Sequence, residues 1–209
     1  MSALTEGPCR FLAPPVKGIC KSRATTLRSM RTLTMIAAAA MSLSLLSAPA
    51  EAAPASPFSL PYQPGTTHLV TQGFGGSSHN SGPYTWHGVD FAMASGTPVL
   101  TTMPGTVHSS TLSQGWGHTI VIKHYGDVCS RYAHLSRRVH PPVGGQVGRG
   151  ALIGYSGNTG NSTGPHLHFQ IQKCSDNRTI YWNGFKEYPG LRADDNYIRG
   201  RRLTSQNRP

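Results

Sequence analysis

The sequence is poor in charged residues, and most of those that it has are basic. Only 13% of the 209 residues are charged, with 19 Lys and Arg against 8 Asp and Glu, whereas 24 Gly and 16 Pro make up about a fifth of the chain. This composition argues against a coiled coil or a helical repeat and suits a chain rich in turns and strands. A hydrophobic content of 37% permits a core, so one compact domain is expected rather than global disorder.

No apolar run is long enough to cross a membrane. The longest, Leu33–Leu46, has about 14 residues, whereas a spanning helix needs roughly 20. Three arginines precede this run, and two small-residue cleavage sites follow between positions 48 and 52. These features predict a secretory signal peptide region over residues 1–52, with Met30 as an alternative start. The mature protein is therefore expected outside the cell or in the cell wall, with no stable membrane insertion after cleavage.

Long basic tracts are also missing. Removing residues 1–52 takes away six of the 19 Lys and Arg and two of the 8 Asp and Glu, which leaves 13 basic against 6 acidic residues, a net charge of +7. The remaining arginines are scattered and not interleaved with aromatic residues, so nucleic acid is not the expected partner. A polyanionic cell envelope is the more natural partner for this charge, although solubility explains it nearly as well.

Cysteine is scarce in the expected mature chain, which keeps only Cys129 and Cys174. Two cysteines in an oxidising compartment predict one disulfide. The alternative, Cys129 as a nucleophile, would require a thiolate stabilised by a helix N-terminus or a cation. No helical pattern begins near Cys129, so the disulfide is the preferred interpretation.

The pattern of the mature chain predicts an all-β protein, a mostly antiparallel sheet or sandwich with long loops. Residues 53–67 read as an irregular leader, 68–190 as the folded domain and 191–209 as a polar tail that frays at its end. No segment shows a convincing helical period. Short strand-like runs bounded by turn residues cover His68–Thr71, Gly88–Met93, Pro98–Met103, Thr106–Ser110, His118–Tyr125, Val128–Leu135, Ala151–Tyr155, His166–Lys173 and Thr179–Trp182.

The strongest chemical signal is the segment Gly-Pro-His166-Leu-His168-Phe. Side chains two residues apart in a strand point to the same face, about 6.6 Å apart along it, so both imidazoles should enter one cavity. Taken alone, two solvent-facing histidines on a strand would explain the pattern equally well.

Two further segments favour a metal site over that simpler explanation. In Arg-Tyr132-Ala-His134-Leu, the tyrosine and the histidine are expected to share a strand face, and Gly-Val-Asp90-Phe-Ala supplies a carboxylate. Imidazoles and a carboxylate on separate strands can surround a divalent ion. Zinc takes such nitrogen and oxygen ligands, and a catalytic zinc keeps three protein ligands and one position for water.

Several motifs together resemble one known family. They are Asp90-Phe-Ala, Gly96-Thr-Pro-Val, Tyr-Ala-His134-Leu, Gly154-Tyr-Ser-Gly-Asn-Thr-Gly and Gly-Pro-His166-Leu-His168-Phe. Their order and spacing resemble the lysostaphin and staphylolysin type zinc endopeptidases, the LytM-domain family. The resemblance covers about residues 68–185.

The resemblance implies an antiparallel β-fold with an open groove, one zinc ion and hydrolysis of peptide bonds in bacterial peptidoglycan, in crosslinks or stem peptides. It assigns Asp90 and His168 to the metal, and His134 and His166 to catalysis outside the metal shell. Tyr132 is expected to help hold the transition state. The protein is expected to be a monomer that binds peptidoglycan and, through its charge, anionic wall polymers.

The first metal histidine is the point at which this sequence departs from the lysostaphin branch. That branch has His four residues before the aspartate, where this chain has Trp86. The neighbouring His87 should face the opposite side of the strand, unless a bulge intervenes. The staphylolysin branch takes this histidine from an upstream loop rich in Gly and Ser, and His79 resembles that arrangement. His79 is therefore the expected ligand, with His87 as the alternative.

Two other functions remain open at this point. A LytM domain without activity could bind cell wall or activate another hydrolase, but such relatives usually lose metal ligands, and here only the first ligand is ambiguous. A cupin-like metal protein also has His-x-His on a β-fold. Cupins normally supply a glutamate a few residues after that pair, whereas Gln170, Ile171, Gln172 and Lys173 follow here.

Overall fold

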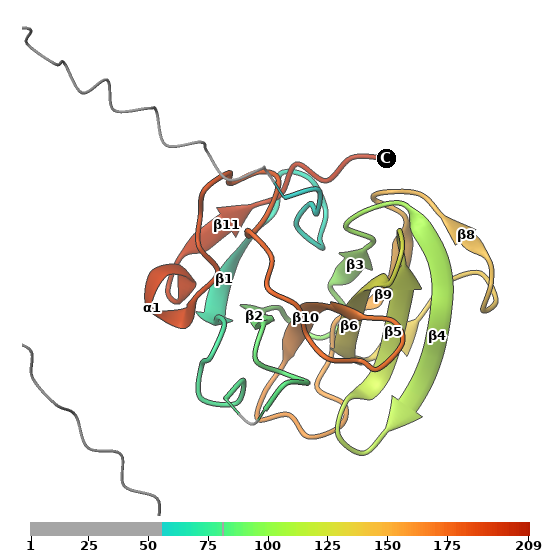
Figure 1. The fold of residues 1–209 in the computed structure, drawn as a ribbon, viewed down its shortest axis with the longest axis horizontal. Helices are drawn as coiled ribbons and strands as arrows, with labels where there is room; N and C mark the ends of the chain where they lie inside the picture. The colour runs from blue at the N-terminus through green and yellow to red at the C-terminus, as the bar shows by residue number, and fades with distance from the viewer. Residues whose placement is uncertain (1–55, 81) are drawn as a thin grey trace, which may run out of the picture. The chain divides into compact units, whose positions relative to one another are not determined.

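The computed structural model describes residues 56–80 and 82–209, which lie within one compact unit, Pro49–Pro209 (Figure 1). The signal region expected at residues 1–52 falls outside the described residues, as does the start of the leader expected at 53–67. In the described part, no helix combines the length and the apolar character that crossing a membrane requires.

Antiparallel β-structure dominates this unit, so the expected fold class is confirmed. The larger sheet has eight strands in the order β11-β1-β2-β10-β6-β5-β4-β8. All of its neighbouring strands are antiparallel. The strands are β1 (Thr67–Gln72), β2 (Gly88–Ala92), β4 (Gly105–Ser113), β5 (Gly117–Lys123), β6 (Val128–Leu135), β8 (Gln146–Val147), β10 (His166–Lys173) and β11 (Arg202–Thr204).

A smaller sheet and one short helix complete the described elements. The smaller sheet has the order β3-β9-β7, and the helix has a single turn. Side chains of both sheets belong to one hydrophobic core, which includes Val99 and Ile153 from the smaller sheet. The elements are β3 (Pro98–Leu100), β7 (Arg137–Arg138), β9 (Leu152–Tyr155) and α1 (Asp195–Ile198).

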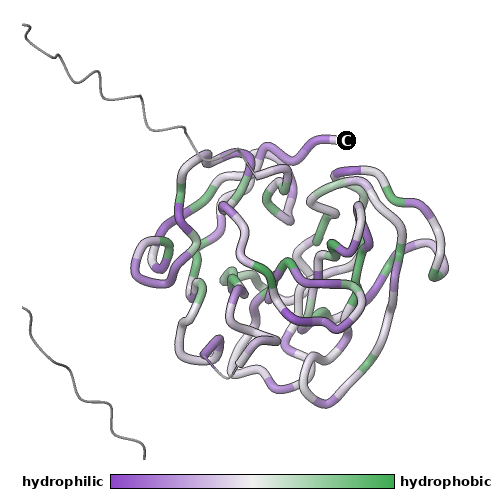
Figure 2. The backbone as a smooth tube through the Cα atoms, viewed as in Figure 1, coloured by the Kyte–Doolittle hydropathy of each residue, from purple (hydrophilic) through white to green (hydrophobic). Residues whose placement is uncertain are grey.

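Strand β10 lies in the middle of the larger sheet and separates the core from the polar face. Its residues Leu167, Phe169 and Ile171 are almost completely buried in the core. His166 and His168 alternate with them and so point to the other face. Hydrophobic stretches run through these central strands, whereas the C-terminal segment is mostly hydrophilic (Figure 2). Burying each of the three core side chains stabilises the fold by about 1.5–3 kcal/mol.

Strand β6 carries a bulge near His134. The pairing with β5 shifts between His118, which faces Leu135, and Ile120, which faces Tyr132, so β6 has one residue more than β5 over this stretch. His134 itself has φ of 59°, a left-handed conformation that is uncommon outside glycine. An extra residue of this kind turns a side chain to the other face of the sheet. The side chain of His134 thus leaves the face that strand alternation predicts for it.

The C-terminal segment differs from the polar tail, frayed at its end, that is expected over residues 191–209. Strand β11 pairs with β1 and joins the edge of the larger sheet. Leu203 and Asn207 are buried, and the Asn207 side chain donates hydrogen bonds to the carbonyl oxygens of Leu60 and Thr101. The expectation of a frayed tail is wrong, because a few isolated contacts hold this segment and a polar composition does not reveal them.

The leader also contributes to the core. Residues 56–66 contain no strand, as the many Pro and Gly residues predict. Phe58, Leu60 and Tyr62 are nevertheless buried, and the Tyr62 hydroxyl donates to the carbonyl oxygen of Leu203. The expected strand at Thr179–Trp182 is reduced to one isolated bridge between Gln172 and Thr179.

The disulfide predicted from the cysteine count is present. Cys129 at the start of β6 and Cys174 just after β10 are joined, with their Cα atoms 5.2 Å apart. This separation is within the usual range for a disulfide. Because Cys129 pairs with Gln172 in the sheet register, the bond fastens the two strands where their ladder ends.

We expect this disulfide to stabilise the fold without taking part in catalysis. It closes a loop with a sequence separation of 45. A loop of this length is worth about 3–4 kcal/mol in the chain-entropy account. The double variant Cys129→Ser/Cys174→Ser should lose about that much free energy of unfolding in urea titrations. Two reactive thiols in the unfolded, unreduced mature protein would contradict the pairing.

Candidate metal centre

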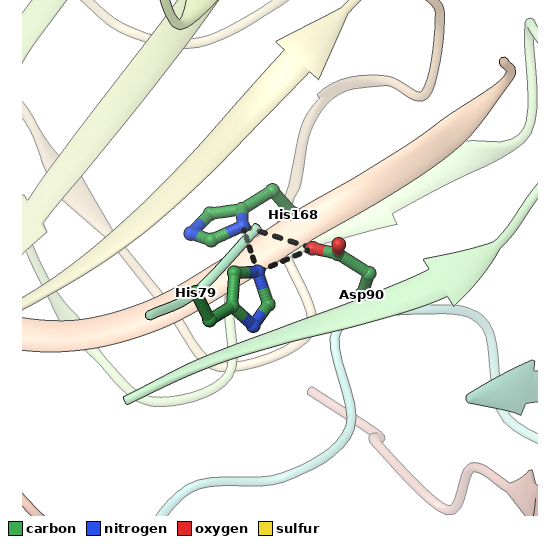
Figure 3. A group of neighbouring side chains, drawn as sticks. All are labelled: His79, Asp90 and His168. Carbon is green, nitrogen blue, oxygen red and sulfur yellow. Dashed lines mark hydrogen bonds and ion pairs between the residues drawn. The ribbon is translucent and has the colours of Figure 1, made fainter. Parts of the chain in front are cut away.

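Three buried side chains from separate parts of the chain converge at one point (Figure 3). Asp90 lies on β2 and His168 on β10, and the two are direct cross-strand partners. His79 comes from the loop between β1 and β2. The exposed fractions are 1% for His79, 7% for Asp90 and 3% for His168. Cross-strand partners share a face, so the strand register brings the carboxylate to the imidazole.

The three residues, here called the metal triad, present their ligand atoms at nearly equal distances. Nδ1 of His168 is 2.9 Å from Oδ1 of Asp90, Nε2 of His79 is 3.2 Å from the same oxygen, and the two nitrogens are 3.1 Å apart. Tetrahedral ligands about 2.0–2.1 Å from a zinc ion lie roughly 3.3 Å from one another. The triad therefore has the spacing and the donor set for three of the four positions around zinc.

The other nitrogen of each imidazole already has an oxygen partner. Nδ1 of His79 is 2.9 Å from the carbonyl oxygen of Gly73, and Nε2 of His168 is 2.9 Å from Oε1 of Gln170. An oxygen acceptor requires an N–H at each of these positions, so in neutral rings the lone pairs are on the two nitrogens that face each other. Two lone pairs and a carboxylate oxygen at this spacing need a cation between them, which fits a bound metal ion.

The charges of the triad are coupled. Burial alone would raise the pKa of Asp90, but the adjacent imidazoles of His168 and His79 hold that pKa far below its usual range. Burial lowers the pKa of His168, whereas for His79 the nearby carboxylate outweighs burial and raises the pKa. Gln72 Nε2 lies 3.1 Å from Oδ2 of Asp90 and donates a further hydrogen bond. The carboxylate is thus ionised, as a metal ligand must be.

The loop that carries His79 folds tightly against β1. A Cβ atom at Gly76 would lie 2.2 Å from Cγ of Gln72, so only glycine fits there. Gln72 Oε1 accepts a hydrogen bond of 3.0 Å from the backbone N–H of Ser78, the residue before His79. The same glutamine therefore holds the loop on one side and the carboxylate of Asp90 on the other.

A second pair of histidines lies beside the triad. The ring centroids of His134 and His166 are 4.6 Å apart, and Nε2 of His166 is 4.0 Å from Oδ2 of Asp90. Nδ1 of His134 is 2.9 Å from the carbonyl oxygen of Thr159, so in the neutral ring this nitrogen carries the proton and Nε2 is a free acceptor. Burial lowers the pKa of His134 to about 4, which keeps the ring neutral at neutral pH.

Both groups of histidines open on a groove, as expected. The cavity that all three residues of the triad line, here called the main cavity, measures about 330 Å³, and a slightly larger adjoining hollow of about 380 Å³ shares Asp90 and His166 with it. The groove therefore continues beyond the triad past Asp90 and His166. The residues that line the main cavity are Ser78, His79, Thr85, Asp90, Gly115, Trp116, His134, Asn161, Thr163, His166 and His168.

Tyr132 lies on the opposite side of the sheet from this cavity. Its cross-strand partner is Phe169 in the core, and its hydroxyl group is 3.0 Å from Oγ1 of Thr102. The side chain is fully buried. The prediction that Tyr132 shares a face with His134 is wrong, because the bulge turns His134 alone toward the groove. Tyr132 therefore does not reach the groove in which a transition state would form.

The two histidines that compete for the first metal position lie in different surroundings. His79 contacts Asp90 and His168, whereas Nδ1 of His87 is 3.1 Å from Oγ1 of Thr179. His87 does not line the cavity. Strand β2 begins at Gly88, so no bulge within the strand reverses the direction expected for His87.

Sequence patterns do not identify two residues that contact the site. The Trp116 ring centroid is 5.1 Å from that of His168, and Gln72 donates to Asp90. A tryptophan between two glycines in a turn is an unusual feature that could have indicated Trp116. Nothing in the sequence distinguishes Gln72 from other strand glutamines.

Comparison with known proteins gives a consistent result. The model of Peptidase family M23 matches residues 84–181, a range that includes Asp90, His134, His166 and His168 but not His79. The peptidoglycan DD-endopeptidase ShyA of Vibrio cholerae is 45% identical over 85 residues, which is 41% of this chain and 20% of ShyA. The chain thus spans about a fifth of the length of the curated relatives that it matches first.

Two solved catalytic domains are similar over most of their own length. That of the antimicrobial peptidase lysostaphin from Staphylococcus simulans is 36% identical, with 55% of this chain and 82% of that domain covered and a TM-score of 0.42. A mutant of the prophage-encoded M23 protein EnpA from Enterococcus faecalis is 28% identical, with 59% and 98% covered and a TM-score of 0.50. The 36% identity to the lysostaphin catalytic domain, of which 82% is covered, and the match to the family model show that the chain belongs to peptidase family M23.

Proposed function

We propose that the protein is a zinc-dependent endopeptidase that hydrolyses peptide bonds in bacterial peptidoglycan. The observation that carries this proposal is the metal triad, in which three donor atoms lie 2.9–3.2 Å from one another next to a second pair of histidines in the same groove. The names of ShyA, a peptidoglycan DD-endopeptidase, and of lysostaphin, an antimicrobial peptidase, support the choice of substrate.

His79, Asp90 and His168 are the proposed ligands of one zinc ion per chain. The chemistry that a bound zinc supplies is Lewis acidity, which polarises a carbonyl group and makes water acidic enough to act as a nucleophile near neutral pH. The chain holds its ligands by short hydrogen bonds from outside the triad, through Gly73, Gln170 and Gln72.

His134 and His166 are the proposed catalytic residues outside the metal shell. His134 is neutral and has a free Nε2, so it can accept the proton of the attacking water and pass it to the leaving amine. Nδ1 of His166 lies 2.8 Å from the carbonyl oxygen of Gly164, which directs Nε2 into the groove. In its protonated form His166 donates a hydrogen bond there to the oxyanion of the scissile carbonyl.

The proposed setting is the cell wall or the outside of the cell. Export through the signal region at residues 1–52 and a net charge of +7 on the remaining chain support action on an anionic envelope, including its anionic wall polymers. We propose that the mature protein acts there as a monomer.

Digestion of purified peptidoglycan tests the proposed activity. The mature, zinc-loaded protein should release new amino and carboxyl termini from walls, and mass spectrometry of the fragments should identify the bond. Chelation should abolish release, and added zinc should restore it. Zinc binding without cleavage of walls of several crosslink types would contradict hydrolysis and favour the alternative, a domain that binds wall material without cutting it.

The first zinc ligand is tested by comparing two histidine variants. His79→Ala should lose zinc and wall hydrolysis, because it removes one of three donor atoms. His87→Ala serves as a matched control, since its imidazole contacts Thr179 and not the triad. Zinc content measured by mass spectrometry decides between them, and loss in His87→Ala alone would reverse the assignment.

The division between ligands and catalysts makes a second prediction. His134→Ala and His166→Ala should keep their zinc but lower kcat by a factor of about 10²–10⁴, the usual contribution of a general acid or base. Asp90→Ala and His168→Ala should lose the metal itself. Equal loss of zinc in His166→Ala and His168→Ala would show that the pair is wrongly divided.

A further inference from the structure

A line of buried polar side chains leads from His168 away from the groove. Gln170 and Gln172, here called the amide relay, follow His168 on the same face of β10 because strand side chains alternate. Nε2 of His168 is 2.9 Å from Oε1 of Gln170, and Nε2 of Gln170 is 2.8 Å from Oε1 of Gln172. Both glutamines have an exposed fraction of 0%.

Arg131 on β6 stands at the far end of this line. It is the cross-strand partner of Gln170, and its Nε is 2.7 Å from Oε1 of Gln172. Its Nη2 and Nε2 of Gln172 both donate to Oδ1 of Asn177, at 3.0 Å and 2.7 Å. The guanidinium also lies 4.8 Å from the ring centroid of Trp116. Hydrogen bonds thus connect His168 to Arg131 through the side chains of Gln170 and Gln172 without a gap.

Burying the charged guanidinium of Arg131 is unfavourable in free energy unless a partner compensates the charge. Among residues 56–80 and 82–209, no carboxylate lies within ion-pair distance of it. Its exposed fraction is 9%. Burial lowers the pKa of Arg131 to about 10, so the side chain is still charged at neutral pH. Burying a charge against amide oxygens alone is unfavourable compared with an apolar residue, so a role beyond packing is expected for it.

A guanidinium can only donate hydrogen bonds, and this fixes the direction of every bond in the line. Gln172 must turn its single amide oxygen toward Arg131. Gln170 then faces that oxygen with its NH2 group, which turns its own oxygen toward His168. An oxygen at that place accepts only from an N–H, so the ring proton of His168 must be on Nε2. The lone pair is then on Nδ1, the nitrogen that belongs to the metal triad.

We propose that Arg131, acting through the amide relay, fixes the ring proton of His168 on Nε2 and thereby keeps Nδ1 available to the metal. This is a positioning role, and it rests on the proposed zinc site. Without the arginine, the amides of Gln170 and Gln172 can reverse together and keep their mutual hydrogen bond. His168 can then carry its proton on Nδ1, the nitrogen that faces the metal position. Zinc must displace this proton before it binds.

The sign of the effect separates this role from simple electrostatics. Arg131→Met removes a positive charge that is separated from His168 by the two glutamine side chains of the relay. Removing this charge would by itself make the zinc ion bind more tightly, because like charges repel. Loss of the relay's direction should make zinc bind more weakly. Partners of metal-bound histidines typically contribute about 10–100-fold to metal affinity, so this range is the expected loss for Arg131→Met.

The test measures zinc affinity of the mature protein by competition with a chromophoric chelator. Arg131→Lys should stay within about threefold of the unaltered protein, because lysine also only donates. Ser130→Ala is the control for lost buried hydrogen bonds in the same strand, since Ser130 is fully buried and bonds to Tyr132 and His124, away from the relay. Its zinc affinity should not change, even where its melting temperature falls.

Several results would overturn the relay. These are unchanged or tighter zinc binding in Arg131→Met, a loss in Arg131→Lys equal to that in Arg131→Met, or an equal loss in Ser130→Ala. If Arg131→Met does not fold, Gln172→Leu breaks the middle of the relay and should weaken zinc binding by the same factor; unchanged affinity there also overturns it. An unaltered protein that holds no zinc contradicts the proposed function itself, and the relay with it.

Discussion

The pairing of β2 with β10 is the constraint on which the rest of the site depends. In this register Asp90 faces His168, while on the other side of the sheet Phe91 faces Leu167 and Val89 faces Phe169. A slip of one residue would expose the apolar set and send the carboxylate or the imidazole into the core. The free energy gained by burying four apolar side chains therefore also fixes the spacing of two metal donors.

The third donor comes from neither of these two strands. His79 reaches the site from a loop, and the loop is held by contacts to residues that also hold the strands. Gln72 at the end of β1 bonds both to the loop at Ser78 and to Asp90. The position of the loop ligand is in this way tied to the strand ligands, and a loop donor can be nearly as well placed as a strand donor.

Much of the site follows from strand periodicity, and the failures of prediction occur where the periodicity breaks. Alternation places His166 and His168 on one face and turns His87 away from Asp90, which leaves His79 as the candidate. The same rule misplaces Tyr132, because a single left-handed residue at position 134 shifts the strand and a sequence pattern contains no sign of it. The packed C-terminal strand is missed for a related reason, since Leu203 is its only apolar residue. The direction of the amide relay depends on hydrogen-bond donors and acceptors across strands, which no period along the chain encodes.

The bulge at His134 is unfavourable for the backbone by about 1–3 kcal/mol and must be held by its surroundings. Two contacts do so: the backbone N–H of His134 donates to Trp116, and its ring donates to Thr159. Thr159 lies so close to Gly117 that a Cβ atom there would be 2.2 Å from the Thr159 hydroxyl oxygen. The two loops that line the groove therefore lock each other and the bulge together. The strain places a neutral imidazole on a rigid strand facing the metal triad, whereas regular alternation would have buried it beside Tyr132 in the core.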